Sequence, residues 1–331
     1  MMNDKTMHCA RWHVLPFIIL LCAVCHVSFS PAGAQTLTFV ELNCENLFDT
    51  RHDSLKQDTE FAPDGVRRWT TSNYWRKLKH IGQEILSCSA QLPDIVALVE
   101  VENDSVLHAL LRRSVLRQAG YQYLMTESPD VRGLDVALVY QPYAFRPICY
   151  EAIGVAPLPG MRPTRDVLYV KGRCLSGDTL HVFVVHAPSR YGGERATRPN
   201  RMQVMHTLLA YMQALPQNAK VIVAGDFNDY ADSPSVRLLC RNGLQNVTKT
   251  AVGIHGAKGT YRYQGKWQSI DHVLVSPGLA SQVDSVYIND APFLLEDDPR
   301  YGGKRPRRTF LGYRYQRGFS DHLPLVVRFR W

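Results

Sequence analysis

The apolar residues of this chain recur in short runs rather than in long amphipathic stretches. Eight runs have the length of a β-strand, are rich in β-branched residues and are bounded by Gly, Pro, Asp or Asn, a pattern typical of strands. These runs cover residues 36–43, 94–101, 135–140, 167–174, 179–187, 220–227, 269–276 and 323–329. The pattern predicts a protein built mainly from short strands.

Three longer segments between the runs, residues 74–88, 105–118 and 199–215, are typical of helices. The last two repeat an apolar residue every three or four positions, as a helix with one buried face does. Strands outnumber helices, and several strands follow one another with no helix between them. We therefore expect an α/β protein with two mixed, largely antiparallel β-sheets packed face to face and helices outside, a four-layer sandwich.

The first 34 residues differ from the rest of the chain. Lys5 and Arg11 precede an apolar stretch at 14–29, and the small residues Ala32, Gly33 and Ala34 follow it. This is the three-part pattern of a secretory signal peptide, and it predicts cleavage after Ala34. An uncleaved anchor is the alternative, although this stretch is short for a membrane span. We expect a secreted or periplasmic protein with no stable membrane span after signal cleavage.

The composition after residue 34 is that of one ordinary globular protein. The whole chain is 45% apolar and 21% charged, and no linker divides residues 35–331, which are expected to form a single domain. The five cysteines outside the signal segment include no CxxC pair, so neither a zinc knuckle nor a disulfide framework is expected. Without Asp4, Lys5 and Arg11, the formal charge of +8 becomes +7. A basic exported protein suits a polyanionic partner such as nucleic acid, a phosphorylated metabolite or an acidic lipid surface.

The segment from Glu296 to Gly318, here called the basic arm, concentrates this charge. It contains seven basic residues, with Arg305, Arg307 and Arg308 close together, and four aromatic residues among them. One interpretation is a solvated loop. The other is an arm that binds phosphates and offers surfaces for stacking.

Polar side chains stand where the predicted strands end. Such residues can converge on one rim while the sheets below stay rigid. They are Asn43, Glu45, Glu100, Glu102, His186, Asp226, Asn228, Asp229, Asp271, His272, Asp321 and His322. Carboxylates, amides and histidines at six such ends, without a nucleophilic Ser or Cys motif, indicate one metal-assisted site.

These residue types suit phosphate chemistry. Mg²⁺ prefers carboxylate and amide oxygens, which Asn43, Glu45 and Glu100 could provide; Mn²⁺ and Ca²⁺ are alternatives. Asp226 could act as the base that orients a water molecule, and His322 could stabilise the phosphate oxygens. Asp271 placed near His322 would fix its tautomer and raise its pKa. Zinc is disfavoured because the histidines lack zinc-ligand spacing such as HExxH.

The ordered segments ELNCENLFD, ALVEVEN, RGLDVALVY, HAPSR, GDFND, SIDHVLVS and SDHLPLV resemble the endonuclease/exonuclease/phosphatase superfamily. That superfamily includes pancreatic-type deoxyribonucleases, abasic-site exonucleases, bacterial sphingomyelinases and inositol polyphosphate 5-phosphatases. The matches follow the family's order over residues 37–331, and the family has a two-sheet α/β sandwich fold.

The resemblance implies a role for each matched residue. His322 would be the catalytic imidazole, with Asp271 as its orienting carboxylate and Asp321 as its neighbour on the metal side. Asn43 resembles the first-strand Asn of the phosphate or metal environment, while Glu45 and Glu100 fall where members have metal-binding acids. The remaining matches are His186 at a phosphate-contacting position, Asp226 and Asn228 in the GDxN motif, and Arg132 near the substrate.

The sequence says less about the substrate than about the type of reaction. A calcineurin-like phosphatase would need an early DxH and a GNHE, and the chain has neither. The stretch Gln268–His272 differs from the sequence that inositol phosphatases carry around the orienting Asp. The signal segment disfavours an abasic-repair enzyme, because such enzymes work inside cells. The basic arm disfavours a sphingomyelinase, which would be expected to carry apolar membrane-contact loops. We predict an exported Mg²⁺-dependent phosphodiesterase, preferably a poorly selective endonuclease on nucleic acid whose phosphates the arm contacts. The alternatives are a phosphatase or phosphodiesterase on small or lipid phosphates, and an inactive phosphate-binding protein.

Overall fold

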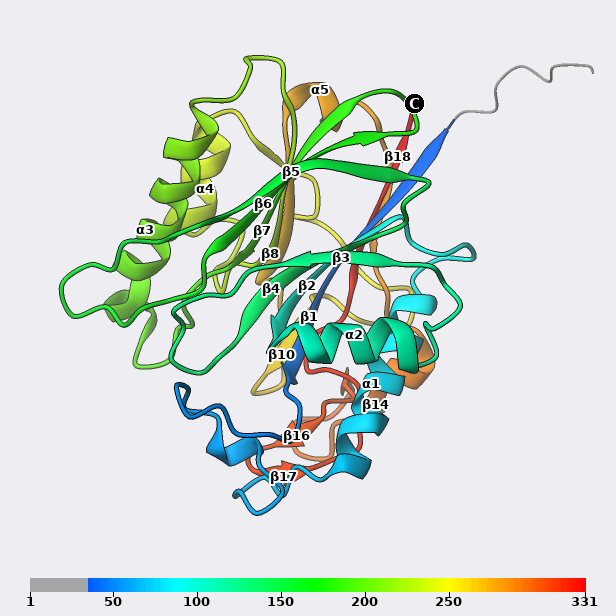
Figure 1. Cartoon of the computed structure of the whole chain (residues 1–331), viewed down its shortest axis with the longest axis vertical. Coiled ribbons are helices and arrows are strands. Elements are labelled where there is room, and N and C mark those ends of the chain that lie inside the picture. Colours follow the sequence, from blue (N-terminus) through cyan, green and yellow to red (C-terminus); the bar gives the residue numbers. More distant parts are fainter. Residues whose placement is uncertain (1–34) are drawn as a thin grey trace, which may run out of the picture. The chain divides into compact units, whose positions relative to one another are not determined.

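Two six-stranded sheets form the centre of the fold, as a computed structural model of the chain shows (Figure 1). The structure describes residues 35–331, so the predicted signal peptide lies outside the described residues. Among the residues described, no helix combines the length and apolar character needed to cross a membrane. The first sheet has the order β13-β18-β1-β2-β4-β3. Its strands are β13 (Val283–Ile288), β18 (Leu325–Arg330), β1 (Thr36–Leu47), β2 (Ile95–Val101), β4 (Asp135–Tyr140) and β3 (Gln122–Met125).

The second sheet has the order β5-β6-β7-β8-β12-β9. Its strands are β5 (Phe145–Ile153), β6 (Val167–Cys174), β7 (Thr179–His186), β8 (Lys220–Asp226), β12 (Asp271–Val275) and β9 (Gln245–Asn246). In each sheet one pair of neighbours is parallel, β1 with β2 and β7 with β8, and every other pair is antiparallel. The predicted mixed and largely antiparallel sheets are confirmed.

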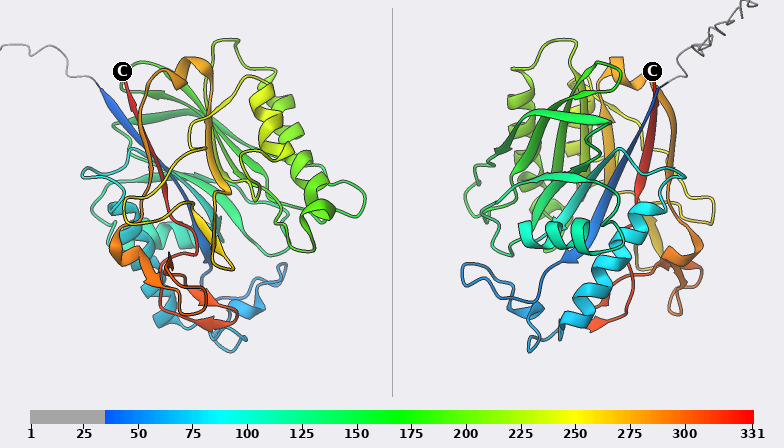
Figure 2. Two further views of the ribbon diagram at one scale, coloured as in Figure 1. Left: turned by 180° about the vertical axis from the view of Figure 1, so that it is seen from behind. Right: turned by 45° about the vertical axis from the view of Figure 1, so that its right-hand side comes forward.

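Helices cover the outer face of each sheet (Figure 2). Helices α1 (Thr71–Leu86) and α2 (Asp104–Arg113) pack on the first sheet, and α3 (Glu194–Met212) and α4 (Pro234–Arg241) on the second. Helix α1 lies between β1 and β2 in the chain and α3 between β7 and β8, so each supplies the crossover that a parallel pair requires. The order of layers is therefore helix, sheet, sheet, helix, as expected. A short α5 (Pro277–Ala280) follows β12.

The alternation of side chains along each strand divides the core into separate layers. On β1, Leu37 and Phe39 enter the core between the sheets, whereas Val40 and Leu42 pack beneath α1 and α2. The same inner face continues toward the end of β1, where it presents Asn43. Apolar packing between the sheets thus ends in a polar layer at one edge of the sandwich.

Three short hairpins near that edge were not predicted from the sequence (Figure 1). They are β10 (Tyr261–Tyr263) with β11 (Lys266–Gln268), β14 (Leu295–Asp297) with β15 (Lys304–Pro306), and β16 (Phe310–Leu311) with β17 (Arg314–Tyr315). The last two belong to the basic arm, which is therefore folded. The five cysteines of the described region are free, and Cys44 and Cys88 are buried as thiols.

Candidate active site

The regular backbone of β1 and β2 breaks where these strands end. The β1–β2 register shifts between Asn43 and Leu47, and three residues nearby have left-handed backbone angles. Their φ values are +48° for Glu45, +58° for Asn46 and +61° for Glu100. Each such non-glycine residue costs on the order of 1–3 kcal/mol and persists only where surrounding contacts hold it. Here the backbone N–H of Asn46 donates to Oε2 of Glu100 at 2.8 Å, which ties the two irregular ends together.

On the second sheet, three polar residues lie side by side across neighbouring strands. His186 at the end of β7 is in register with Asp226 at the end of β8, and Asp226 is in register with Asp271 at the start of β12. The parallel and antiparallel pairings thus bring side chains that are distant in the sequence into one row. Three of the polar strand ends predicted from the sequence therefore meet.

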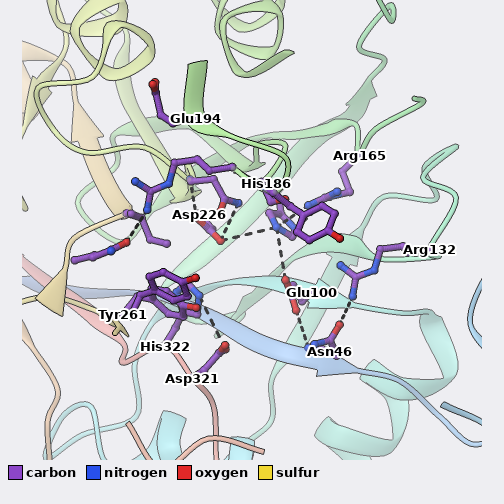
Figure 3. Close-up of a pocket in the computed structure, with 17 residues that line it drawn as sticks. Asn46, Glu100, Arg132, Arg165, His186, Glu194, Asp226, Tyr261, Asp321 and His322 are labelled. Atoms are coloured by element: carbon purple, nitrogen blue, oxygen red, sulfur yellow. Dashed lines mark hydrogen bonds and ion pairs between the residues drawn. The ribbon is translucent and has the colours of Figure 1, made fainter. Parts of the chain in front are cut away.

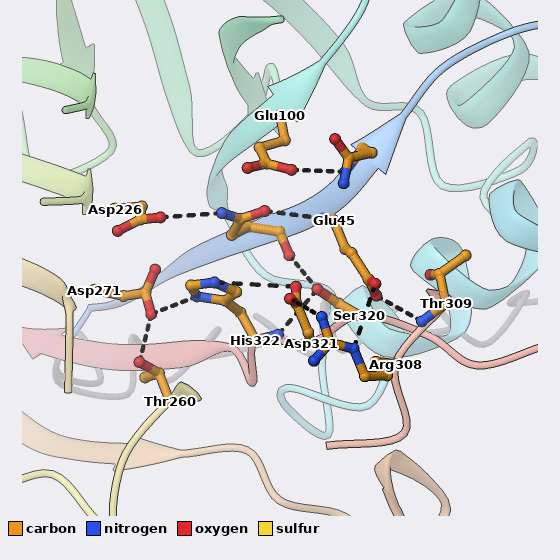
Figure 4. Close-up of polar contacts among 12 residues, drawn as sticks. Glu45, Glu100, Asp226, Thr260, Asp271, Arg308, Thr309, Ser320, Asp321 and His322 are labelled. Atoms are coloured by element: carbon orange, nitrogen blue, oxygen red, sulfur yellow. Dashed lines mark hydrogen bonds and ion pairs between the residues drawn. The ribbon is translucent and has the colours of Figure 1, made fainter. Parts of the chain in front are cut away.

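His322 joins this row from the loop before β18 (Figure 4). Its Nδ1 lies 2.8 Å from Oδ2 of Asp271, which also accepts a hydrogen bond from the hydroxyl of Thr260. The ring of Tyr261 packs on the imidazole with centroids 4.8 Å apart. Burial alone would lower the pKa of His322, but the Asp271 carboxylate, aided by Asp321, holds it well above its usual value. The imidazolium is the form favoured here.

Asp226 lies in the middle of the site and is oriented by two asparagines. Nδ2 of Asn43 is 3.2 Å from Oδ2 of Asp226, and the backbone N–H of Asn228 donates to Oδ1 at 2.7 Å. The left-handed backbone of Asn228, with φ of +50°, makes this tight turn. Burial and the nearby Asp271 carboxylate raise the pKa of Asp226 to about 7, against the opposing charge of His322. A carboxylate with such a pKa can accept a proton near neutral pH.

His186 is a neutral imidazole enclosed by cations. Burial, with Arg165 and Arg132, lowers its pKa well below the usual value. Nη2 of Arg165 lies 2.6 Å from Nε2 of His186, and Nε2 is 3.7 Å from Oε1 of Glu100. Sequence reasoning missed Arg165, which stands just before β6 outside every recognised segment, so the sequence held no signal for it.

The donor set at the end of β2 fits a divalent cation. The carboxylates of Glu100 and Asp226 lie near each other, at 3.7 and 3.9 Å from Nε2 of His186, and carboxylate oxygens are ligands that Mg²⁺ prefers. Asn43, predicted to offer an amide oxygen, instead turns its Nδ2 to Asp226, while its Oδ1 accepts the backbone N–H of Glu45. The repulsion from Asp271 and Glu100 that helps raise the pKa of Asp226 shows a local excess of negative charge, which a cation would offset. Glu100 could hold such an ion.

Glu45 has a different environment from Glu100. Its two carboxylate oxygens accept the backbone N–H groups of Thr309 and Phe310, at 2.5 and 3.0 Å, so it anchors the basic arm to β1. Burial and the Asp321 carboxylate raise the pKa of Glu45 to about 7. Nη2 of Arg308 lies 2.7 Å from Oδ2 of Asp321 (Figure 4). Glu45 and Asp321 were both predicted as metal ligands, and the structure brings them together around Arg308.

A second grouping of acids and histidine also has the spacing of a metal site. Within the described residues, Asp226, Asp271 and His322 each offer a ligand atom, and these atoms lie within 4.8 Å of one another. Nδ1 of His322 is already bound to Asp271, however, and an imidazolium cannot be a ligand. This trio could instead transfer a proton and stabilise charge, beside an ion that Glu100 could hold.

Three other polar residues at strand ends face away from this site. His272 follows Asp271 and so points to the opposite side of β12, where its Nε2 is 2.9 Å from the carbonyl oxygen of Asp229. Asp229 itself pairs with the fully buried Arg201 at 2.8 Å. Glu102 accepts the backbone N–H of Asp49. These contacts are structural.

A cleft of about 620 Å³ opens over the polar groups of the site (Figure 3). Glu100, Asp226, Asn228, Asp321 and His322 all line it. Its walls carry cationic and aromatic side chains, namely Arg132, Arg165, Arg190, Tyr191, Tyr261 and Tyr263. The side chain of Arg132 donates to Oδ1 of Asn46, so this predicted substrate residue does reach the site.

The arginines of the basic arm do not line the cleft. Arg305 pairs with Glu296 at 2.8 Å, Arg308 pairs with Asp321, and Arg307 is exposed beside the ring of Phe319. The arm instead supports the β10–β11 hairpin, because Arg262 donates to the carbonyl oxygens of Gly302 and Lys304. On that hairpin, Tyr261 and Tyr263 are directed into the cleft.

The fold and the site are those of a phosphate-ester hydrolase. Residues 38–330 match the Endonuclease/Exonuclease/phosphatase family, and the chain belongs to it. Like other members, it is a metal-dependent phosphoric ester hydrolase. A search of curated proteins found no matching relative.

Solved structures with this fold come from bacteria and animals. An endonuclease/exonuclease/phosphatase family protein from Bacteroides thetaiotaomicron is 16% identical, with a TM-score of 0.60 over 90% of this chain and 99% of that one. A mannosyl-6-phosphatase from the same bacterium is 16% identical, with a TM-score of 0.58 over 88% and 98%. The human nocturnin catalytic domain with a bound sulfate anion is 18% identical, with a TM-score of 0.56 over 89% and 93%. At these identities the likeness establishes the fold.

Proposed function

We propose that this protein is a Mg²⁺-dependent phosphodiesterase that acts on nucleic acid as a poorly selective endonuclease. The observation that carries the proposal is the composition of the cleft walls, where arginines and exposed tyrosines flank the catalytic groups. Arginine binds phosphates without regard to base identity, and tyrosine rings stack on any base. A strand of nucleic acid offers both groups at every nucleotide.

The residues of the site support in-line hydrolysis of a phosphodiester. A water molecule oriented by Asp226 gives its proton to that carboxylate as its oxygen bonds to phosphorus, and the phosphorus–oxygen bond to the leaving group breaks. His322, charged and held by Asp271, donates to a phosphate oxygen on which negative charge develops. A divalent cation bound through Glu100 would neutralise phosphate charge. We propose Mg²⁺ as that ion, with Mn²⁺ and Ca²⁺ as the alternatives.

The protein is further proposed to act outside the cytoplasm after cleavage of its signal peptide behind Ala34. The sequence pattern of the first 34 residues supports this step. Expression of the full chain with a C-terminal tag, followed by N-terminal sequencing of the exported product, tests it. A product that begins at Gln35 is expected, whereas an intact N-terminus retained with the cells would contradict export.

A phosphatase for small phosphate esters is the second candidate. Arg132, Arg165 and His186 gather on one side of Glu100, an arrangement that suits the extra charge of a terminal phosphate. The same fold occurs in a mannosyl-6-phosphatase. An inactive phosphate-binding role has less support, since Asp226, Asp271 and His322 are all present and hydrogen-bonded.

One set of assays separates these functions. The purified residues 35–331 are incubated with plasmid DNA, RNA, mannose 6-phosphate, inositol phosphates and phospholipid, each with Mg²⁺ or with excess chelator. Nicking of plasmid or cleavage of RNA that requires Mg²⁺ is the expected result, and the same protein with His322→Ala is the control for a contaminating nuclease. Release of inorganic phosphate from a monoester, with nucleic acid left intact, would replace the proposal with the second candidate.

A further inference from the structure

One arginine of the cleft is held in place by two other segments of the chain before any substrate binds. Arg190 lies four residues beyond the end of β7. Its Nη2 donates to Oε1 of Gln268 at 2.6 Å, and its guanidinium carbon lies 4.5 Å from the ring centroid of Tyr230. Gln268 ends β11 and Tyr230 follows the GDFND segment. A side chain fixed in this way loses little further entropy when it binds a ligand.

Among residues 35–331, Arg190 has no close ion-pair partner, and Glu194, the cleft acid whose pKa Arg198 and also Arg190 lower, is itself paired with Arg198. Within the described part of the chain, no carboxylate lies within 4.0 Å of its guanidinium, although many other arginines have such a partner. Arg305 and Arg308 are examples of paired arginines. Gln268 contributes a neutral amide oxygen, which orients the guanidinium and leaves its charge and most of its five N–H donors available. Such a group is suited to an anion.

Arg190 borders the reacting centre on the side of His322. Its partner Gln268 is in register with Tyr261 across the β10–β11 hairpin, and the ring of Tyr261 packs on the imidazole of His322. Arg132 has the corresponding position on the side of Glu100. Its partner Asn46 accepts a hydrogen bond from Arg132 through Oδ1 and donates its backbone N–H to Oε2 of Glu100. The scissile phosphate would thus have an arginine on each side.

We propose that Arg190 is a specificity-determining residue that binds the phosphate next to the scissile one, so that the preferred substrates are chains of nucleotides rather than isolated phosphate esters. This inference rests on the proposed function. Two exposed rings support it, since Tyr191 and Tyr263 also line the cleft and are 93% and 54% exposed. A base attached to the bound phosphate could stack on them.

The test compares Arg190→Gln with the unchanged protein on two substrates, a single-stranded oligonucleotide and bis(4-nitrophenyl) phosphate, which has no flanking phosphate. The variant loses a charged hydrogen bond to the flanking phosphate, which the small diester lacks. We therefore expect kcat/KM for the oligonucleotide to fall on the order of tenfold further than kcat/KM for the small diester, mainly because KM rises. The dependence of log KM on log salt concentration should become shallower by about 0.7, because the variant neutralises one phosphate fewer.

Arg173→Gln is the matched control, because Arg173 is exposed and lies at the far end of β6, opposite Thr179. It should leave both substrates and the salt dependence unchanged. Equal losses on the two substrates, or none on either, would overturn the role of Arg190 while leaving nuclease activity of the unchanged protein intact. If the unchanged protein cleaves mannose 6-phosphate and no oligonucleotide, the proposed function itself fails, and the role of Arg190 fails with it.

Discussion

His322 and Asp271 form a buried hydrogen-bonded pair, with 2.8 Å between Nδ1 and Oδ2, although 51 residues separate them in the chain. Asp271 begins β12 of the second sheet, and His322 lies just before β18 of the first (Figure 4). The pair therefore joins the two sheets at the edge where the polar strand ends meet. Asn43 on β1 adds a second link, because its Nδ2 donates to Oδ2 of Asp226 on β8 at 3.2 Å.

The first prediction concerns the charge on His322. Asp271 raises the pKa of this imidazole, so the active imidazolium persists above the ~6.5 of a free histidine. Asp271→Asn removes that attraction, so His322 loses its proton at a lower pH. We expect kcat/KM to fall and its alkaline limb to move to lower pH, measured from about pH 5 to 9. An alkaline limb at the same pH in the variant would show that another group sets it.

His322→Ala provides the matching chemical test. With the imidazolium gone, turnover should fall by several orders of magnitude, since charge stabilisation in the transition state is removed. The fold, followed by circular dichroism, and Mg²⁺ binding, followed by calorimetry, should be retained, while the unfolding temperature falls because the buried Asp271 carboxylate loses its partner. Near-native turnover of this variant would mean that the segment Ser320–Pro324 is only a polar turn before β18.

Glu100 is expected to be the acid on which metal dependence rests. Glu100→Gln removes one negative charge while nearly preserving shape, so metal-dependent turnover should drop on the order of a hundredfold or more. Raising the Mg²⁺ concentration should recover part of the activity, which a titration of rate against Mg²⁺ measures. Full activity of the unchanged protein in excess chelator would contradict metal-assisted hydrolysis altogether.

The sequence predicted the architecture and the principal groups of the site because both depend on local patterns. Apolar runs identified eight strands, and polar residues at their ends identified His186, Asp226, Asp271 and His322. Arg165 and Arg190 were not found, because each stands in a loop without a pattern and reaches the cleft only through tertiary contacts.

The basic arm illustrates the other limit of sequence reasoning. Its cluster of arginines suggested a free phosphate-binding surface, but Arg308 lies between Glu45 and Asp321, and Glu45 is distant in sequence. Which acids neutralise a basic segment is decided by the fold and not by nearby sequence. β5 was also missed, because most of its residues are exposed and the run lacks a buried apolar pattern.

Arg307 and Arg308 should therefore behave differently when neutralised. Arg308→Gln leaves the acids Glu45 and Asp321 without their cation, so turnover should fall on a nucleic acid and on a small phosphodiester alike. Arg307→Gln removes an exposed charge outside the cleft and should mainly weaken binding to long duplex DNA, with a salt dependence shallower by about 0.9. The same assays on Arg305→Gln, which breaks the ion pair with Glu296, give a third comparison. Equal effects of Arg307→Gln on both substrates would mean that the arm acts only by shaping the site.

Glu84 on α1 gives a prediction about stability rather than activity. It is fully buried, and neither carboxylate oxygen has a hydrogen-bond partner among residues 35–331. Burial raises its pKa from 4.5 to about 8, against the opposing charge of Lys77. Below pH 4.5 both the folded and the unfolded chain hold this proton. Between pH 4.5 and 8 the unfolded chain releases the proton while the folded chain keeps it, so stability falls as pH rises.

Glu84→Gln removes this ionisation from both states. The free energy of unfolding of the variant, relative to the unchanged protein, should therefore increase by a few kcal/mol between pH 4.5 and 8, and then level off. Urea unfolding at several pH values across this range measures the difference. Glu127→Gln, which removes an exposed carboxylate, controls for the change in net charge. A difference that does not vary with pH would mean that Glu84 is ionised in the folded protein, with the buried ammonium of Lys77 stabilising its charge more strongly than burial opposes it.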